Sequence, residues 1–486
     1  MTILAIDAGT TGVTALVVNE SAQIVGRGYE EFPQHFPRPG WVEHEPEQIW
    51  QATLSSCRQA LQGQTVAAVG ITNQRETAVL WSRTTLAAPR RAIVWQDRRS
   101  AEVCDRLRES GAEDQVRQLT GLRFDPYFTG TKLRWLAEND ERAWAGVSAG
   151  EVMVGTVDSY LIARLTAGRT SATDASNASR TLLFDITCGE WSPELCDLLG
   201  VPLTSLPDVM PSYGEIARTD PGTFLGLDLP ICGIAGDQQA ALFGQVCFGW
   251  GDVKTTYGTG SFVLVNTGAE MVPSDAGLLT TVAWMTPSGE LTYALEGAVF
   301  VTGAAVQWLR DGLGIIGSAR EIEALASTVP DSGGVVFVPA LTGLGAPRWD
   351  PDARGAIFGI TRGTTRAHIA RATLEAIAFQ VSEVVGLLPG VTVMRADGGA
   401  AANSLLLQLQ ADQLGVPVER PETLETTGLG AAFLAGLGAG VWSSIDELRS
   451  TWRLGRRFQP GDPDPDGRRR WQAAVGRTTG WGALPP

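Results

Sequence analysis

The chain has 486 residues and a formal net charge of −15, from 38 basic and 53 acidic side chains. Only two of the basic residues are lysines, Lys132 and Lys254, and neither follows a glycine, which excludes a P-loop of the Gly-Lys-Ser/Thr kind. The three histidines form no His-x-x-x-His pair and the six cysteines no Cys-x-x-Cys pair. A zincin helix, a zinc ribbon and a dithiol redox site are therefore disfavoured, and any chemistry must come from carboxylates, hydroxyls, arginine and glycine backbone.

The composition is that of a globular protein, with 44% hydrophobic and 19% charged residues. At about 150 residues per domain, the length allows two to four domains. The acidic balance argues against nucleic acid as a partner. The apolar stretch 429–442 is too short to span a bilayer, and the first residues contain no basic region or signal-peptide core. We therefore expect a cytoplasmic protein with free thiols and no membrane insertion.

The first elements predict an α/β fold. Apolar runs at 3–6 and 13–18 flank the turn Ala8-Gly-Thr-Thr-Gly12, which predicts a β-hairpin, and 23–28 follows as a third strand. Apolar residues at helical spacing predict a helix over 45–61, and 66–72 is the next buried strand. Strands that alternate with helices in this way are typical of α/β domains.

Near residue 250 the pattern restarts. Strand-like residues 251–257 and 261–266 flank the turn Gly258-Thr259-Gly260, much as the first two strands flank theirs. Few residues match, so this favours two similar halves without proving a duplication; we place the domains at 1–247 and 248–486. The tail 456–486 is rich in proline, glycine, aspartate and arginine, which predicts a loosely packed end.

Two turns could hold phosphate. In Asp7-Ala-Gly-Thr-Thr-Gly12, backbone N–H groups can converge on an anion while threonine hydroxyls add donors. Asp7 at the strand end could hold Mg²⁺ through water. The turn at 256–260 has the same character with fewer signals. An ordinary hairpin turn explains either segment equally well, and this alternative stays open.

Two further aspartates lie at predicted strand ends. Asp237 follows an apolar strand and opens an alanine-rich helix, at the sheet edge where α/β proteins bind ligands; it could accept a proton from a hydroxyl or simply cap the helix. Asp397-Gly398-Gly399 precedes a predicted helix at 404–414. Those glycines would let a flat purine approach the backbone, although an ordinary strand–turn–helix connection has the same sequence.

A polar cluster follows the buried strand 66–71. Arg75 and Glu76 can present donors and acceptors to vicinal hydroxyls, or form a structural salt bridge. Trp95 could wall such a pocket, although any one of the 15 tryptophans is more often a core residue. Taken together, phosphate turns, strand-end carboxylates and a hydroxyl-binding cluster are the parts of a phosphoryl transferase that needs no lysine. They favour an ATP-dependent kinase without a P-loop.

At this point the sequence resembles the FGGY carbohydrate kinases, from about residue 3 to about residue 460. The family signatures are matched at 127–139 and 355–375. Further matching stretches are Pro39-Gly-Trp-Val-Glu-His-Glu-Pro46, Gly70-Ile-Thr-Asn-Gln-Arg-Glu-Thr77, Asp125-Pro-Tyr-Phe128, Asn177-Ala-Ser-Arg180, the segment 233–244, Tyr257-Gly-Thr-Gly260, the segment 293–300 and Leu341-Thr-Gly-Leu-Gly-Ala-Pro347.

The resemblance implies an α/β fold with two actin-like (ribonuclease H-like) ATPase domains flanking a deep catalytic cleft. The implied reaction is the ATP- and Mg²⁺-dependent phosphorylation of glycerol to sn-glycerol 3-phosphate, in glycerol catabolism. Alternatives are an FGGY kinase for another small polyol or ketose, and a non-catalytic actin-like ATP-binding protein. Relatives form dimers or tetramers, so a homodimer and a homotetramer both stay open.

The resemblance also implies roles for individual residues. Asp237 would be the general base, and Asp7 and Asp237 would position Mg²⁺. Glycerol would be held by Arg75, Glu76, Trp95, Tyr127, Asp237 and Gln238, with Phe262 packed on its carbon chain. The phosphates would contact Thr10, Thr11 and Gly12, and the rest of the nucleotide Thr259, Gly303, Gln307, Gly399 and Asn403. The residues Tyr127, Phe262, Gly303 and Gln307 come from the resemblance alone.

The sequence departs from the family pattern at two places. Thr14 stands where these kinases usually have an arginine, which removes a cation near the transferring phosphate. Bacterial relatives inhibited by fructose 1,6-bisphosphate have a glycine-rich loop that ends in arginine, whereas the corresponding segment here ends in Asp228. We predict that the bisphosphate does not inhibit this protein.

Overall fold

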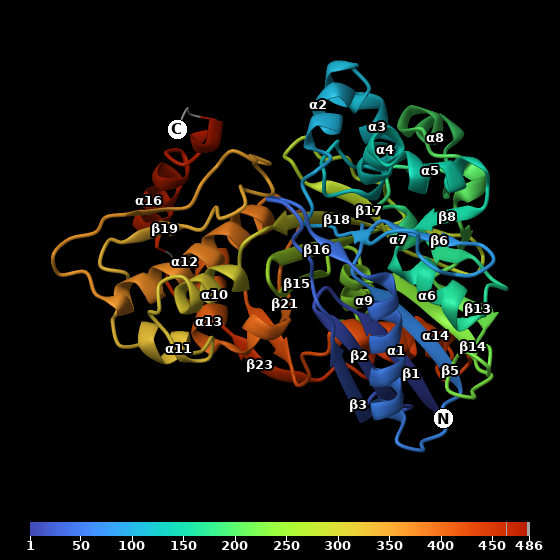
Figure 1. The fold of residues 1–486 in the computed structure, drawn as a ribbon. Coiled ribbons are helices and arrows are strands. Elements are labelled where there is room, and N and C mark those ends of the chain that lie inside the picture. The colour runs from blue at the N-terminus through green and yellow to red at the C-terminus, as the bar shows by residue number, and fades with distance from the viewer. Residues whose placement is uncertain (463, 484–486) are drawn as a thin grey trace.

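The computed structural model describes residues 1–462 and 464–483 and has two lobes, each built on one β-sheet with flanking helices (Figure 1). The first sheet has six strands in the order β13-β14-β5-β1-β2-β3. Its strands β1, β5 and β14 run parallel, while β2, β3 and β13 are antiparallel to their neighbours. The bounds are β1 (Thr2–Ala8), β2 (Gly12–Asn19), β3 (Ile24–Glu31), β5 (Ala68–Asn73), β13 (Tyr213–Arg218) and β14 (Pro230–Gly236).

Both faces of the first sheet are covered, which explains why its central strands are apolar throughout instead of alternating. Leu4 and Ile6 of β1 pack in one core with helices α1 (Pro46–Leu61) and α6 (Val157–Leu165). Ile3 and Ala5 point to the other face, where α9 (Asp237–Gly244) and α14 (Thr426–Gly438) lie. The predicted hairpin, third strand and first helix are confirmed, with boundaries shifted by a few residues.

The second sheet repeats this arrangement. Its order is β17-β18-β16-β15-β21-β22-β23. The central strand β15 forms an antiparallel hairpin with β16, and β18 pairs with β16. On the other side of β15, β21 and β22 run parallel to it. In the first sheet, β2 and β3 lie in the same way on one side of β1, and β5 and β14 on the other. The two predicted turns therefore occupy equivalent places in two similar halves. The bounds are β15 (Val253–Tyr257), β16 (Ser261–Gly268), β17 (Leu279–Met285), β18 (Leu291–Val299), β21 (Met394–Asp397), β22 (Val418–Pro421) and β23 (Leu454–Phe458).

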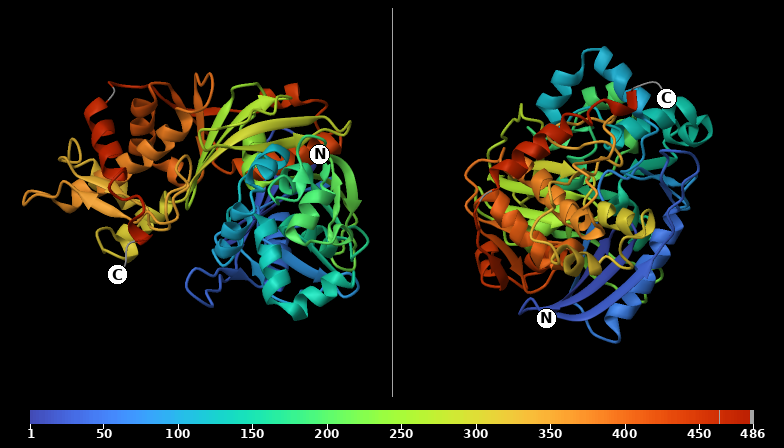
Figure 2. Two further views of the ribbon diagram at one scale, coloured as in Figure 1. Left: turned by 90° about the horizontal axis from the view of Figure 1, so that it is seen from above. Right: turned by 90° about the vertical axis from the view of Figure 1, so that its left-hand side faces the viewer.

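Helices of the C-terminal half gather on the outer side of the second lobe (Figure 2). They are α10 (Gly303–Asp311), α11 (Glu321–Ala326), α12 (Arg366–Val385), α13 (Ser404–Leu414) and α16 (Pro465–Val475). Insertions of the first half add α2 (Ala101–Glu109), α3 (Glu113–Thr120), α4 (Thr129–Asn139), α5 (Glu141–Ser148), α7 (Ala175–Ala178) and α8 (Pro193–Leu199), and α15 (Ile445–Arg449) follows α14. The short strands pair as β4 (Glu43–His44) with β7 (Ala92–Ile93), β6 (Val79–Ser82) with β8 (Val152–Gly155), β9 (Ala172–Asp174) with β12 (Asp208–Met210), β10 (Phe184–Asp185) with β11 (Glu190–Trp191), and β19 (Val336–Val338) with β20 (Ala356–Phe358).

Helix α14 connects distant parts of the chain, because it packs on the first sheet although it lies late in the sequence. The packing is close: a Cβ atom on Gly70 would lie 2.2 Å from the carbonyl oxygen of Ala431, and one on Gly430 would meet the carbonyl of Ala240 on α9. Its burial on all sides explains the apolar stretch 429–442. Across the described residues, every helix is too short or too polar to cross a membrane. The domain boundary at 247/248 stays a prediction.

The expectation of a loosely packed tail is wrong for most of its length. Residues 454–458 form β23 at the edge of the second sheet, and α16 follows it. Trp471 is buried and stacks on Phe379 of α12, with ring centroids 5.6 Å apart. The composition concealed three apolar residues at helical spacing, Trp471, Ala474 and Val475. Residues 463 and 484–486 of the predicted tail lie outside the described residues.

Candidate active site

A cavity of about 140 Å³ lies where the two lobes meet. From the first lobe it is lined by side chains that follow β1, β5 and β14, and from the second lobe by the turn between β15 and β16. All seven residues predicted to bind the polyol lie in its wall. The complete lining is Thr10, Arg75, Glu76, Trp95, Tyr127, Asp237, Gln238, Thr256, Gly258, Thr259, Gly260 and Phe262.

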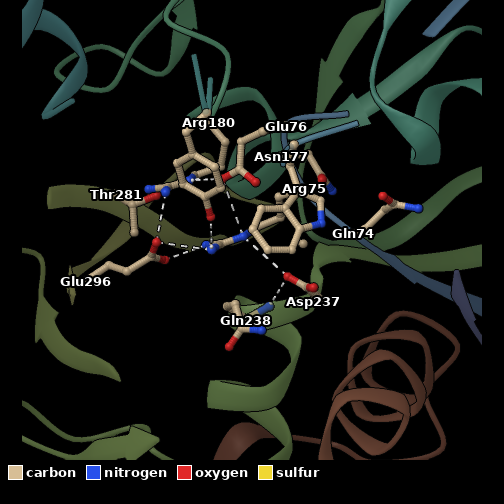
Figure 3. Close-up of polar contacts among 12 residues, drawn as sticks. Gln74, Arg75, Glu76, Asn177, Arg180, Asp237, Gln238, Thr281 and Glu296 are labelled. Atoms are coloured by element: carbon tan, nitrogen blue, oxygen red, sulfur yellow. Dashed lines mark hydrogen bonds and ion pairs between the residues drawn. The ribbon is translucent and has the colours of Figure 1, made fainter. Parts of the chain in front are cut away.

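The guanidinium of Arg75 forms the polar floor of this cavity (Figure 3). Its Nε lies 3.3 Å from Oδ1 of Asp237, and its Nη2 donates to the Tyr127 hydroxyl at 3.2 Å. Glu76, also buried, accepts a hydrogen bond from Arg180 at 2.8 Å. Arg75 and Glu76 therefore belong to a structural network of ion pairs, while their predicted contact with a polyol stays a prediction.

Aromatic rings form another part of the cavity wall. The ring centroid of Trp95 lies 5.8 Å from that of Tyr127 and 6.1 Å from that of Phe262, both in edge-on geometry. The Trp95 indole N–H donates to the hydroxyl of Thr10 at 3.0 Å, which connects this wall to the first phosphate turn. A small ligand here would meet both aromatic carbon surfaces and charged groups.

Asp237 is the first residue of α9 and does not cap it, because Gly236 holds the cap position. Its carboxylate accepts the backbone N–H of Gln238 at 2.7 Å and is 28% exposed, so it stays accessible from the cavity. Burial raises the pKa of Asp237 to about 6, against the opposing effect of Arg75. A carboxylate with such a pKa is ionised at neutral pH and can still accept a proton.

Asp7 lies on β1 directly opposite Thr14 in the hairpin. Its pKa is raised to about 8, chiefly by burial and in addition by the nearby carboxylates of Asp237 and Glu425. Two carboxylates that repel each other in a partly buried site suit a hard divalent cation, which would relieve the repulsion. Within 1–462 and 464–483, groups of three or more His, Cys, Asp or Glu at metal-binding distance are absent, so phosphate and water would complete the shell.

A second cavity, of about 520 Å³, adjoins the first and shares Gly258 and Thr259 with it. The predicted nucleotide residues Thr259, Gly303, Gln307, Gly399 and Asn403 all line it. The N–H of Gly303 donates to the carbonyl of Gly258 at 3.0 Å, so the start of α10 packs directly on the turn. Thr11, Gly12 and Asp7 lie in the first hairpin, outside the lining of both cavities.

Three charged residues at this site, Glu296, Arg180 and Lys254, had no role assigned from sequence. Glu296 on β18 contacts both Arg75 and Arg180, at 2.5 and 2.8 Å. Lys254 on β15 donates to the side-chain oxygen of Gln238 at 2.5 Å. All three are fully buried. The sequence does contain a sign of this ion pair, because Glu296 stands inside the otherwise apolar segment Ala294-Leu-Glu-Gly-Ala-Val. A charged residue that is buried in a strand is almost always paired.

The two sheets have the same topology, one cavity lies between the lobes, and the adjoining larger cavity lies within the second lobe; this is the arrangement of a two-domain α/β protein with an actin-like fold. The structure of xylulose kinase from Lactobacillus acidophilus has the same fold, with a TM-score of 0.84 at 21% identity over 98% of this chain and 96% of that one. The matching family models narrow the class. Residues 2–244 match the N-terminal domain, and residues 253–439 the C-terminal domain, of the FGGY family of carbohydrate kinases. The chain belongs to this family.

Individual relatives are similar over their full length. The chain is 54% identical to a glycerol kinase of Aromatoleum aromaticum, over 99% of both chains. It is 50% identical to glycerol kinase 2 of Thermotoga maritima, again over 99% of both. The crystal structure of Plasmodium falciparum glycerol kinase with ADP superposes with a TM-score of 0.89, at 34% identity and 98% coverage of each chain.

Proposed function

We propose that this protein transfers the γ-phosphoryl group of ATP to glycerol and forms sn-glycerol 3-phosphate. The observation that carries the proposal is a small polar cavity containing an accessible carboxylate, joined to a larger cavity of nucleotide size. The reaction is that of the relatives named glycerol kinase, which match the chain from end to end. A cavity of about 140 Å³ suits a three-carbon triol.

In the proposed mechanism, the residues of the small cavity orient one terminal hydroxyl. Arg75 and Gln238 donate hydrogen bonds to hydroxyl oxygens, Glu76 accepts hydrogen bonds from hydroxyl groups, and the aromatic wall contacts the carbon chain. Asp237 takes the proton from the attacking hydroxyl as the bond to phosphorus forms. The turn at 258–260 contributes to the lining of both cavities. In the proposed mechanism, the transferred phosphoryl group would therefore lie next to this turn.

Asp7 and Asp237 are the residues proposed to hold Mg²⁺. When bound, the ion would neutralise charge on the phosphates, which in many kinases is done in part by lysine or arginine. This assignment agrees with a chain that has threonine at position 14 and only two lysines. Thr10, Thr11 and Gly12 would contact phosphate from the hairpin turn, and residues at 303–307 and 399–403 the rest of the nucleotide.

The decisive experiment is a coupled ADP-release assay with glycerol, dihydroxyacetone, erythritol and xylulose as acceptors. We expect the highest kcat/KM with glycerol. Equal or greater efficiency with xylulose would replace glycerol by a sugar as the substrate. If none of the four acceptors supports ATP turnover, the proposed reaction itself is contradicted.

Three further assignments are proposals of the same kind. We place the protein in the cytoplasm, where its substrates are made or imported. We propose that it assembles as a homodimer or a homotetramer, and a sedimentation measurement distinguishes the two. We expect activity to be insensitive to fructose 1,6-bisphosphate, because Asp228 at the end of the 222–228 loop pairs with Arg218 at 3.0 Å and offers the anion a carboxylate.

A further inference from the structure

The carboxylate of Glu296 lies behind the polyol cavity and comes from the other half of the molecule. It extends from β18 of the second sheet, whereas Arg75 follows β5 of the first. Its two oxygens accept from Nη1 and Nη2 of Arg75 at 2.5 and 3.1 Å, and one of them also accepts from Arg180 at 2.8 Å (Figure 3). Glu296 is fully buried and outside the cavity lining, so it acts only through its partners.

Arg75 has an acceptor for each of its three nitrogens. Nε faces Asp237 at 3.3 Å and Glu76 at 3.7 Å, Nη1 also donates to Gln239 at 3.1 Å, and Nη2 also donates to Tyr127. The two-point contact with Glu296 fixes the plane of the guanidinium, since a bidentate carboxylate pair permits one orientation. That plane decides which edge of Arg75 faces the cavity and which faces Asp237.

The charges explain what would happen without Glu296. Four of the buried charges, Arg75, Arg180, Glu76 and Glu296, form one ion-paired network and balance in sign within it. Removing one carboxylate leaves a buried guanidinium short of a partner, which is strongly unfavourable. The nearest replacement for Arg75 is Asp237, already at 3.3 Å, and that carboxylate has to stay free to accept a proton.

We infer that Glu296 is a positioning residue: it holds Arg75 in the orientation that binds the acceptor and limits the pairing of Arg75 with Asp237 to the Nε contact at 3.3 Å. The polyol site of the first half is thus completed by a strand of the second half. The inference rests on the proposed function in one respect, that Arg75 binds the acceptor.

The test is the variant Glu296→Gln, which keeps the shape of the side chain and removes its charge. With the best acceptor of the wild-type enzyme, we expect KM for the acceptor to rise about tenfold or more and kcat to fall, as for loss of a charge-assisted hydrogen bond. KM for ATP should stay within about twofold. The matched control is Tyr293→Phe on the same strand, whose hydroxyl also reaches across, to the carbonyl of Ile186 at 2.7 Å; it should leave both KM values unchanged.

A double-mutant cycle shows whether Glu296 acts through Arg75. In an Arg75→Lys background, Glu296→Gln should change the acceptor KM by less than about threefold, because the group it orients is gone. An unchanged acceptor KM in folded Glu296→Gln would overturn the inference. So would an equal rise in the acceptor KM when Glu296→Gln is made in the wild-type and in the Arg75→Lys background, or an equal rise in Tyr293→Phe. If Glu296→Gln does not fold, Glu296→Asp is judged by the same criteria. Wild-type activity on the four acceptors is measured first, so a wrong substrate is recognised separately.

Discussion

Both lysines of the chain are buried, and each contacts from behind a residue that lines the small cavity. Lys254 donates to the side chains of Gln238 and Thr256 at 2.5 and 2.9 Å. Lys132 donates to the carbonyl of Tyr127 at 2.5 Å. Neither lysine lines the cavity. The expectation that the mechanism needs no catalytic lysine stays a prediction, but these contacts give both side chains a supporting role that sequence reasoning missed.

Asp237→Asn tests the proposed base. The amide keeps the size of the side chain but cannot accept the hydroxyl proton, so kcat should fall by roughly 10²–10⁴-fold. Nucleotide binding, followed by calorimetry with ADP, should change little because the nucleotide cavity lies beyond Gly258 and Thr259. Retained turnover in this variant would show that another group takes the proton.

Asp7 gives a prediction for pH and metal. Its pKa is raised to about 8 in the folded protein, chiefly by burial, from an ordinary value of 3.8. The folded state therefore keeps a proton that the unfolded chain releases, and stability from this group is lost as pH rises from about 4 to 8. Mg²⁺ binds the ionised carboxylates, so millimolar Mg²⁺ should raise Tm more at pH 8.5 than at pH 6.

Asp7→Asn is the control for this effect, because other buried carboxylates also titrate in the same range. In the variant, the pH-dependent part of the Mg²⁺ shift should largely disappear. A Mg²⁺ shift of equal size and equal pH dependence in wild type and Asp7→Asn would place the ion elsewhere. Differential scanning fluorimetry at fixed ionic strength is sufficient for the comparison.

At the scale of single elements, the sequence predicts what local patterns determine. The two hairpins and the helix at 404–414 follow from apolar periodicity and glycine turns, and the structure confirms them. Helix α16 was missed because only three buried apolar residues stand among prolines, arginines and aspartates. The contact of Arg75 with Glu296 joins residues 221 positions apart, and no local pattern encodes such a pairing.

Trp471→Ala tests whether α16 is an integral part of the second lobe. Loss of a buried tryptophan stacked on Phe379 should cost about 3–5 kcal/mol of unfolding free energy. Denaturant unfolding measures it. Trp481→Ala, at a side chain that is 60% exposed, should stay within about 0.5 kcal/mol of wild type. Similar small effects of both variants would mean that the tail is loosely packed after all.

At the scale of the whole molecule, helix α14 joins the two halves. It covers one face of the first sheet together with α9, through glycine contacts too close for any larger residue: a Cβ on Gly233 would lie 2.4 Å from the backbone nitrogen of Ala435, and one on Gly244 would lie 2.0 Å from the carbonyl oxygen of Thr426. The predicted first domain, 1–247, lacks this helix. Its apolar sheet residues Ile3, Ala5, Leu16 and Val18 would be exposed without it.

We therefore expect the fragment 1–247 not to form a stable native structure by itself. It should bind a hydrophobic dye and unfold without a cooperative transition. The same fragment with residues 424–440 attached through a flexible linker should regain a cooperative transition. A cooperative, dye-free fragment 1–247 would show that the first sheet is stable without α14. Calorimetry and dye fluorescence provide the measurements.

The position of α14 also determines the order in which the protein can be completed during synthesis. A ribosome makes the chain from the N-terminus, and the first sheet's strands are all present once residue 236 has emerged. Helix α9 follows at once, but α14, the other helix on this face, ends at Gly438, so about two hundred further residues are translated before the cover is complete. The first half therefore stays incomplete until about nine-tenths of the chain has been made.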